Sequence, residues 1–168
     1  MFENKEKVIF LAPLSAISRR LRLYKISNHL HREFPKLQVT HVGWERIKGE
    51  EEEVGLPYSV NKKIILRGGG YGGSLVKYLY FIWMLRSFFY CLNFTKNDVV
   101  WALGFESAFP AFLASKVRKF KVVFDDADRF SLLFKFPKPI SQIIQYFERL
   151  TSRNVNIMLE INNKGRRK

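Results

Sequence analysis

Residues 98–128 read DVVWALGFESAFPAFLASKVRKFKVVFDDAD, and this stretch decides the fold of the chain. Two apolar runs rich in Val, at 99–103 and 121–124, are separated by small residues that predict a helix at 108–117. Continuous apolar runs at this separation are typical of parallel strands that are buried on both faces of a sheet. The stretch is therefore predicted to form a βαβ unit.

Acidic residues follow each of these two strands. Glu106 comes after the first strand, and Asp125, Asp126 and Asp128 come at the end of the second. In a βαβ unit the carboxyl ends of the strands carry the polar chemistry. There a carboxylate can hydrogen-bond sugar hydroxyls or act as a general base. One of the three aspartates is expected instead to cap the turn that follows.

The same pattern continues on both sides of the βαβ unit. Further strands are predicted at 7–13, 37–44, 62–66 and 156–161, and further helices at 75–94, at 140–149 and between the first two strands. In that first helix, residues 23, 26, 30 and 34 form the predicted inner side, and Ser15 or Ser18 can cap it. The order of elements predicts an α/β fold, an open and mostly parallel sheet with helices on both faces in three α/β/α layers. We expect one domain over residues 1–161 and a polar tail at 162–168.

Charge is the strongest global feature of the sequence. The chain has 29 basic and 15 acidic residues, a net charge of +14, and no acid between Val54 and Asn97. Such a chain is attracted to anionic partners, which include nucleic acid, anionic lipid headgroups and nucleotide phosphates. Cys91 is the single cysteine, so a disulfide framework is excluded and a reducing compartment is expected. No signal peptide is visible, and we expect a cytoplasmic protein.

The segment 75–94 is the most apolar part of the chain and is long enough to span a bilayer. Lys77 near its start and Arg86 near its middle oppose that interpretation, because one central Arg costs about 2.5 to 3.5 kcal/mol on insertion. A buried helix of the domain is the favoured prediction. A helix on the membrane surface and a true span stay open as alternatives.

Gly68, Gly70 and Gly73 have the spacing of a dinucleotide-binding loop between a strand and a helix. That motif belongs after the first strand and needs an acid about twenty residues later, where this chain has Asn93. A flexible connection is favoured, and a phosphate-binding or lid-like loop is the alternative.

Several other kinds of site are excluded or disfavoured. The aspartate cluster has no His or Cys nearby, so no metal site is predicted. His29 and His31 lie two residues apart on a helix and cannot face one site. They and His41 are expected at the surface or half-buried. The sequence has no G-x-S-x-G elbow, P-loop or Cys-x-x-Cys, which removes the common hydrolase, kinase-like and zinc interpretations.

Four segments together resemble a known family. In chain order they are KVIFLAP at 7–13, RLRLYKISNHLHREF at 20–34, LQVTHVGW at 37–44 and the stretch at 98–128. They resemble the amino-terminal Rossmann-like domain of GT-B glycosyltransferases, nearest to glycosyltransferase family four. The most telling piece is the pair D-V-V-W-A and K-V-V-F-D-x-x-D, which is similar to the fourth and fifth strands of that family.

The resemblance implies an acceptor-binding domain of an enzyme whose second domain binds a nucleotide-diphosphate sugar. The residues carried over by position are Asp126 and Asp128 as catalytic groups, Glu106 and Arg129 at the acceptor, and Ser15, Ser18, Arg19 and Arg20 facing the donor phosphates. It implies no tightly bound cofactor, and the nucleotide-diphosphate sugar is a co-substrate of the complete enzyme. The acceptor would be a glycan or a lipid-linked molecule. Many members act at a membrane face, which fits the basic charge of this chain and a peripheral location on an anionic membrane.

The second, donor-binding domain is expected on a separate or missing segment, so the chain alone is expected to be inactive or nearly so. The alternative function is a basic nucleic-acid-binding module. Nucleic acid is the less favoured partner, because most of the aromatic residues fall inside apolar runs that core packing explains.

Overall fold

The computed structural model describes residues 7–50, 58–72, 75–126, 130 and 136–160. Its strands are β1 (Lys7–Ala12), β2 (Gln38–Glu45), β3 (Asn61–Arg67), β4 (Val99–Leu103), β5 (Lys121–Asp126) and β6 (Ile157–Glu160). Its helices are the 3₁₀ turn η1 (Ile17–Arg19), α1 (Leu21–Glu33), α2 (Leu75–Cys91), α3 (Phe105–Arg118) and α5 (Lys138–Asn154).

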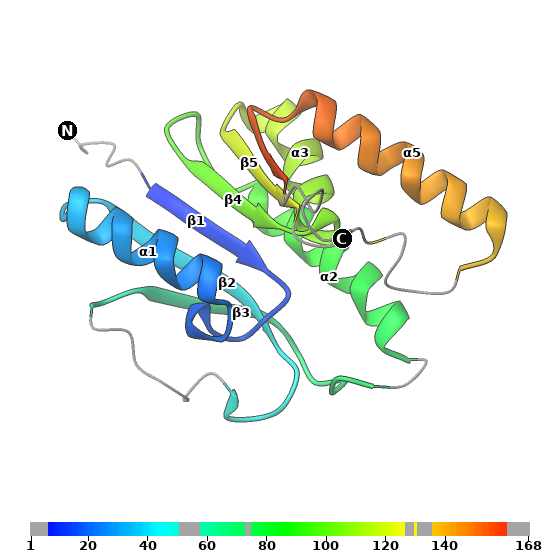
Figure 1. Ribbon diagram of the computed structural model, residues 1–168, viewed down its shortest axis with the longest axis horizontal. Coiled ribbons are helices and arrows are strands. Elements are labelled where there is room, and N and C mark those ends of the chain that lie inside the picture. The colour runs from blue at the N-terminus through cyan, green and yellow to red at the C-terminus, as the bar shows by residue number, and fades with distance from the viewer. Residues whose placement is uncertain (1–6, 51–57, 73–74, 127–129, 131–135, 161–168) are drawn as a thin grey trace, which may run out of the picture.

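The six strands form one sheet in the order β3-β2-β1-β4-β5-β6 (Figure 1), and every neighbouring pair is parallel. This confirms the predicted open parallel α/β fold. The chain builds the sheet outward from β1 in one direction through β2 and β3, and then returns to the other side of β1 with β4. The strand order therefore reverses between β1 and β4, which is the place where folds of this kind bind ligands.

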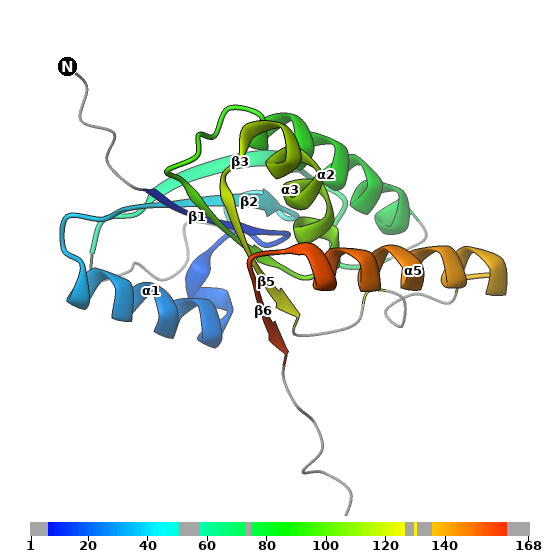
Figure 2. The ribbon, with the colours of Figure 1, turned by 90° about the horizontal axis from the view of Figure 1, so that it is seen from above.

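Helices cover both faces of the sheet, as Figure 2 shows for α1 on one side and α2 with α3 on the other. Residues on β1 alternate between the two layers, since successive side chains of a strand point to opposite faces. Ile9 and Leu11 belong to the core under α2, α3 and α5, whereas Val8 and Phe10 belong to the core under α1. The continuous apolar run of β1 is thus explained by burial on both faces.

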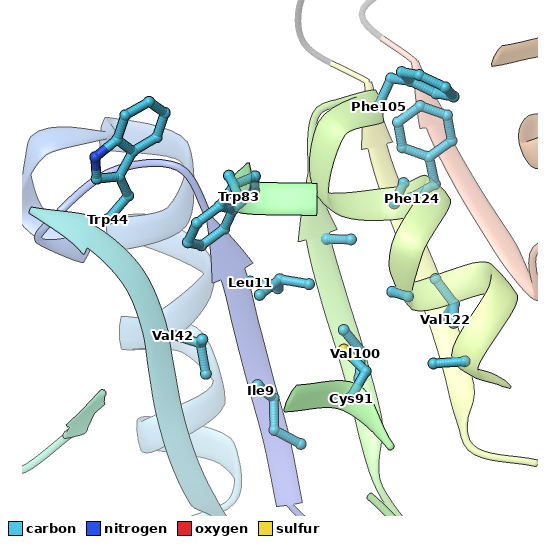
Figure 3. Close-up of a cluster of buried hydrophobic side chains, with 14 of the residues drawn as sticks. Ile9, Leu11, Val42, Trp44, Trp83, Cys91, Val100, Phe105, Val122 and Phe124 are labelled. Carbon is cyan, nitrogen blue, oxygen red and sulfur yellow. The ribbon is translucent and has the colours of Figure 1, made fainter. Parts of the chain in front are cut away.

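The larger core lies between the sheet and the α2–α3–α5 layer (Figure 3). Two fully buried indoles belong to this core, those of Trp44 on β2 and Trp83 on α2. Their rings are stacked, with centroids 6.5 Å apart. Helix α3 presents the small residues Ala108, Ala111 and Ala114, all fully buried. Side chains of this size let the helix approach β4 and β5 closely, which explains the small-residue run in the deciding stretch.

Two local predictions about helix ends were wrong. Helix α3 begins at Phe105, so Glu106 lies in its first turn and not in a turn before it. Helix α1 begins after η1 with Arg20 at its N-cap and no side-chain cap, so neither Ser15 nor Ser18 caps it. Phe34, which was predicted to face the core, lies just past the end of α1 and is 57% exposed.

His41 also differs from its predicted position at the surface. It is fully buried on β2, and neither ring nitrogen has a hydrogen-bond partner in the part of the chain that the structure describes. Burial, aided by the charge of Lys62, lowers the pKa of His41 to about 4. The imidazole is therefore neutral and acts as a core side chain.

Helix α2 belongs to the domain, with Trp83 and Cys91 fully buried on its inner side. Over the described ranges, no helix is both long enough and apolar enough to cross a bilayer. The transmembrane alternative for residues 75–94 therefore finds no support, and α2 is a helix of the core layer.

Candidate functional site

A cleft with a volume of about 400 Å³ opens at the carboxyl ends of β1 and β4, where the strand order reverses. The residues that line it are Pro13, Leu14, Arg19, Arg20, Arg46, Tyr71, Tyr80, Leu103, Gly104 and Glu106. They come from the loops after β1, β2, β3 and β4 and from α2 and α3. One buried acid and three arginines therefore share this cleft.

Glu106 provides the carboxyl group of the cleft and is only 6% exposed. Its side chain folds back over Gly104, so that a Cβ on Gly104 would lie 2.6 Å from Oε2. Oε2 has no hydrogen-bond partner among the described residues. Burial raises the pKa of the Glu106 carboxyl to about 7 and Asp126 adds to the rise, against the lowering effects of its own backbone N–H, Arg46 and Arg20. A carboxyl with this pKa can accept or donate a proton at neutral pH.

Arg46 is a cation held in place on the wall of the cleft. It directly follows β2, and its guanidinium carbon lies 4.1 Å from the ring centroid of Trp44. Its Nη2 donates to the Tyr80 hydroxyl at 2.7 Å and to the Pro13 carbonyl at 3.4 Å. Because these contacts come from both sides, the guanidinium is fixed before any ligand arrives.

Glu50 ties the loop after β2 to the loop after β1. Its Oε2 accepts hydrogen bonds from the backbone N–H groups of Arg46 and Ile47 at 3.0 and 3.1 Å. Its Oε1 pairs with Arg19 Nη1 at 3.2 Å and accepts a hydrogen bond from the Tyr71 hydroxyl. Arg19 is therefore engaged with Glu50, whereas Arg20 is exposed and acts electrostatically on Glu106 and Tyr80.

This arrangement can recognise a molecule that combines a hydroxyl group with a negative charge. The Glu106 carboxyl can accept a hydrogen bond from the hydroxyl, and the guanidinium of Arg20 or Arg46 can hold a phosphate or carboxylate. Tyr71 and Tyr80 add ring faces of the kind on which sugar and nucleotide rings rest.

The structure brings together some of the site residues predicted from the sequence. Arg19, Arg20 and Glu106 share the cleft. Ser15 is fully buried and Ser18 half-buried, and neither lines it. Asp128 and Arg129 lie outside the described residues.

Asp126 lies in a second, more open pocket, between α5 and the ends of β5 and β6. The residues lining that pocket are Phe124, Asp126, Gln145, Glu148, Arg149, Ser152 and Met158. Asp126 remains close enough to Glu106 to influence its pKa. The catalytic role predicted for Asp126 therefore stays a prediction, from a position beside the cleft.

Asp125 is a structural residue. It is fully buried, its Oδ1 pairs with Arg22 Nη1 at 3.0 Å, and its Oδ2 accepts a hydrogen bond from the Trp101 indole N–H at 3.1 Å. Burial raises the pKa of the Asp125 carboxyl, while Trp101 and Arg22 act in the opposite direction. Arg22 on α1 thus pairs with a buried carboxylate near the end of β5.

The described glycines after β3, at positions 68–70 and 72, belong to the connection between β3 and α2. The N–H groups of Gly68 and Gly70 donate to the carbonyls of Glu45 and Arg46 at 2.8 and 3.2 Å, so they do not face a ligand. Gly68, Gly69 and Gly70 all have positive φ, which explains why glycine is used there. This geometry favours the connection over the phosphate-binding loop, and Gly73 lies outside the described residues.

Arg46, Tyr71 and Tyr80 are the site residues that the sequence did not reveal. The position of Arg46 just after the carboxyl end of a predicted strand could have marked it as a site residue. It lies, however, in a loop with many charged residues, and the sequence does not distinguish it from them. No signal marked the two tyrosines. For the described residues, no group of three or more His, Cys, Asp or Glu side chains is placed to hold a metal ion.

Three solved structures have a similar architecture, and two of them are named as UDP-N-acetylglucosamine 2-epimerases. A protein assigned as UDP-N-acetylglucosamine 2-epimerase from Listeria monocytogenes is 15% identical, with a TM-score of 0.57 over 93% of this chain and 39% of that chain. MurG from Acinetobacter baumannii is 14% identical, with a TM-score of 0.50 over 92% of this chain and 40% of that chain. This chain has a GT-B-like fold. A further UDP-N-acetylglucosamine 2-epimerase is 11% identical, with a TM-score of 0.56 over 94% of this chain and 42% of that chain.

At these identities the likeness establishes the fold alone. The chain spans about two fifths of the length of each of these three proteins. No protein-family model matches the chain, and no curated protein matches it. Membership of glycosyltransferase family four, expected from the sequence, stays a prediction.

Proposed function

We propose that this chain is the acceptor-side domain of a glycosyltransferase. The complete enzyme would move a sugar from a nucleotide-diphosphate sugar to a glycan or a lipid-linked acceptor, with the donor held by a domain on another segment. The observation that carries the proposal is the cleft where the strand order reverses, in which the buried Glu106 carboxyl has an unpartnered oxygen beside Arg20 and Arg46. The GT-B-like fold and the nucleotide sugars named in two of the similar proteins support it.

In this proposal Glu106 accepts the proton of the attacking hydroxyl. A bond forms between the acceptor oxygen and the anomeric carbon of the donor sugar, and the bond from that carbon to the diphosphate oxygen breaks. The nucleoside diphosphate leaves with the electron pair, and the Glu106 carboxylate takes the proton. A pKa of about 7 suits this exchange. Near neutral pH a large fraction of such a group is ionised, and the carboxylate is basic enough to accept the proton.

Arg20 and Arg46 hold a negative charge on the acceptor, and Asp126 and Asp128 keep their proposed catalytic role in the complete enzyme. If these aspartates act, Asp126→Asn or Asp128→Asn lowers the rate of the two-domain enzyme; an unchanged rate removes them from the mechanism. The remaining residues predicted from the sequence keep their proposed places, with Arg129 at the acceptor and Ser15, Ser18 and Arg19 on the donor-facing loop.

The chain alone is expected to transfer no sugar. Transfer needs donor and acceptor held in register across a cleft, and one half of that cleft cannot supply the positioning. The test incubates the purified chain with radiolabelled UDP-sugars and alkyl glycosides. Robust turnover by the chain alone overturns the proposal of an acceptor-side half.

Acceptor binding can be measured on the chain by NMR titration with alkyl glycosides and their phosphates. Glu106→Gln is expected to weaken binding of both ligand classes, and Arg20→Gln that of the phosphates by about tenfold, the value of one charge-assisted hydrogen bond. Lys36→Gln is the matched control, because it removes one exposed cation just before β2, at the opposite edge of the sheet. Equal effects of Arg20→Gln and Lys36→Gln would show only general attraction of anions.

The same chain should be titrated against single-stranded oligonucleotides at increasing salt. Binding is expected to be weak and to vanish with salt, since it would come from net charge alone. Tight binding that survives physiological salt would favour the nucleic-acid-binding alternative and count against the transferase proposal.

A further inference from the structure

A second cavity, apart from the candidate cleft, opens beside α1 and has a volume of about 530 Å³. Helix α1 lies on the face of the sheet opposite α2 and α3 (Figure 2). It begins after β1 and ends before β2, so it leads away from the carboxyl ends of the strands, where the cleft lies. We call this cavity the α1 pocket. Five residues of α1 and one residue before β3 line it: Lys25, Asn28, His29, His31, Arg32 and Tyr58.

The α1 pocket is positively charged, because no acid is among its described lining residues. Lys25 and Arg32 are exposed on one side of the helix, seven residues or about 10 Å apart along its axis. Arg32 Nε donates to Glu33 Oε1 at 2.9 Å. Within the described part of the chain this is the side-chain hydrogen bond that Arg32 makes, so its two Nη groups remain for a ligand.

Two imidazoles add hydrogen-bonding groups to the pocket. The His31 ring stacks on the Tyr58 ring, with centroids 4.5 Å apart and 14° between the ring planes. His29 follows Lys25 by four residues and lies on the same side of α1. The prediction that His29 and His31 cannot face one site is therefore wrong for this pocket. Its lining extends from His29 on the outer side of the helix to His31 at the edge beside Tyr58.

The size and charge of the α1 pocket favour a small ligand with several negative charges. Its volume is that of a small-molecule site, for which about 300 to 1,000 Å³ is usual. Ammonium and guanidinium groups bind phosphate oxygens through charge-assisted hydrogen bonds. Because Lys25 and Arg32 are separated along the helix, one phosphate group cannot reach both, whereas a chain of linked phosphates can.

We propose that the α1 pocket binds a linear oligophosphate, which is either an inorganic chain or the phosphate chain of a nucleotide. Lys25 and Arg32 bind phosphates at its two ends, and the Asn28 amide and the two imidazoles donate further hydrogen bonds. The site lies away from the cleft and does not rest on the proposed function.

The first experiment uses the histidines of the unchanged chain as reporters. The chain has three, and all lie in the described residues. Inorganic tripolyphosphate is added at physiological ionic strength, and the imidazole signals are followed by NMR. The signals of His29 and His31 are expected to shift until they saturate, while that of the fully buried His41 stays in place. Single variants His29→Gln and His31→Gln assign the signals. Shifts that do not saturate, or that are equal for all three histidines, overturn the inference.

The second experiment removes the two cations. The combined variant Lys25→Gln, Arg32→Gln is expected to weaken tripolyphosphate binding by more than about tenfold, because charge-assisted hydrogen bonds are lost at both ends. The matched control is Lys96→Gln, Lys121→Gln, which removes the same number of exposed charges beside β4 and β5. The control is expected to bind as the unchanged chain does. Equal losses in both variants would show only general attraction of anions and overturn the inference.

The cleft also holds arginines, so its contribution must be separated from that of the α1 pocket. Arg20→Gln changes the cleft alone, and the shifts of His29 and His31 with tripolyphosphate are expected to persist in this variant. Loss of both shifts in Arg20→Gln would place the bound ligand in the cleft and contradict a separate site.

Two further ligands define the class of molecule. Inorganic phosphate is expected to bind at least about tenfold more weakly than tripolyphosphate, because it loses the hydrogen bonds of one cation. Equal affinities would exclude a linear ligand. Adenosine triphosphate distinguishes the two sources of the phosphate chain. Tighter binding than that of tripolyphosphate would support a nucleotide whose base rests on the His31–Tyr58 pair, and equal or weaker binding would support the inorganic chain.

Discussion

The Glu106 carboxyl depends on residues that come from distant parts of the chain. Its place after β4 could be predicted from the sequence, because the deciding stretch puts an acid directly after a buried strand. Its burial could not, since Arg46 and Tyr80 enter the cleft from β2 and α2. The proton affinity of a side chain is set by such neighbours, which a pattern within one segment does not reveal.

The first prediction concerns the pH dependence contributed by Glu106. Its pKa is raised from 4.5 to about 7 in the folded chain, so between these values the native state holds a proton that the unfolded state has lost. Stability contributed by this group is therefore full below about pH 4.5 and lost as the pH rises toward 7. The variant Glu106→Gln cannot lose stability in this way, because the amide does not titrate. The difference in free energy of unfolding, variant minus unchanged chain, should therefore rise by about 3 kcal/mol between pH 4.5 and pH 8.

Urea unfolding of both proteins at a series of pH values measures this difference. A constant difference across the range would mean that Glu106 titrates as an ordinary surface acid.

The second prediction concerns the ion pair between Arg22 and Asp125. Arg22→Ala leaves a fully buried carboxylate without its cation, and at pH 7 we expect a loss of about 3 kcal/mol in the free energy of unfolding. The loss should shrink at acid pH, where Asp125 becomes neutral. Adding Asp125→Asn to Arg22→Ala should recover part of it, because the amide needs no cation. A double variant no more stable than Arg22→Ala would contradict this account.

At the scale of single elements, the start of α3 depends on Gly104. This residue has a φ of 74°, and a Cβ there would lie within 3 Å of the Glu106 carboxyl. Gly104→Ala should therefore cost about 1 to 3 kcal/mol and move the carboxyl out of place, which should also lower the pKa of Glu106. Gly72→Ala is the control, because a Cβ there meets nothing within 4 Å. Thermal unfolding compares the two variants, and similar losses in both would show that the close approach to Glu106 is not the cause.

The elements themselves were largely predictable. The strands β1 to β6 and the helices α1, α2, α3 and α5 each have a counterpart in the apolar runs and helical spacings of the sequence, whereas the 3₁₀ turn η1 does not. The ends were less so: α3 starts three residues earlier than its small-residue run, and α5 extends further in both directions than the predicted 140–149. Helix ends depend on local backbone contacts, such as the hydrogen bond from Gly104 N–H to the Asp125 carbonyl, that apolar spacing does not report.

For the whole molecule, the sequence predicted the layers of the fold and the edge of the sheet that carries the site. Alternating strand and helix patterns fix both, because connections between parallel strands are right-handed crossovers. What could not be predicted was which of the acids share a cleft. Glu106 follows β4 and Asp126 ends the neighbouring strand β5, yet Glu106 lines the cleft and Asp126 lines the pocket that α5 forms with β5 and β6.

The last prediction uses Cys91 as a reporter of the whole core. The thiol is fully buried, and burial raises the pKa of Cys91 to about 12. Only the thiolate reacts, so modification of the native chain at pH 8 should be slow and should follow global unfolding. The check is the rate of reaction with a maleimide in increasing urea, with Leu85→Cys as the exposed reference. Fast reaction of the unchanged chain without urea would mean that α2 opens on its own.

The order of the strands has a consequence for how the chain is made. Strand β1 leaves the ribosome before the other five strands of the sheet, but its neighbour β4 pairs Val99 with Val8, about ninety residues later. All neighbouring pairs among the described strands are parallel, so none of them closes through a short hairpin. Until β4 is synthesised, the backbone groups along one edge of β1 have no partner strand. The apolar side chains of β1 that later pack in the core with α3 also stay exposed to water. The growing chain is therefore most exposed to aggregation and most in need of chaperones during synthesis of residues 38–98, well before the candidate site exists.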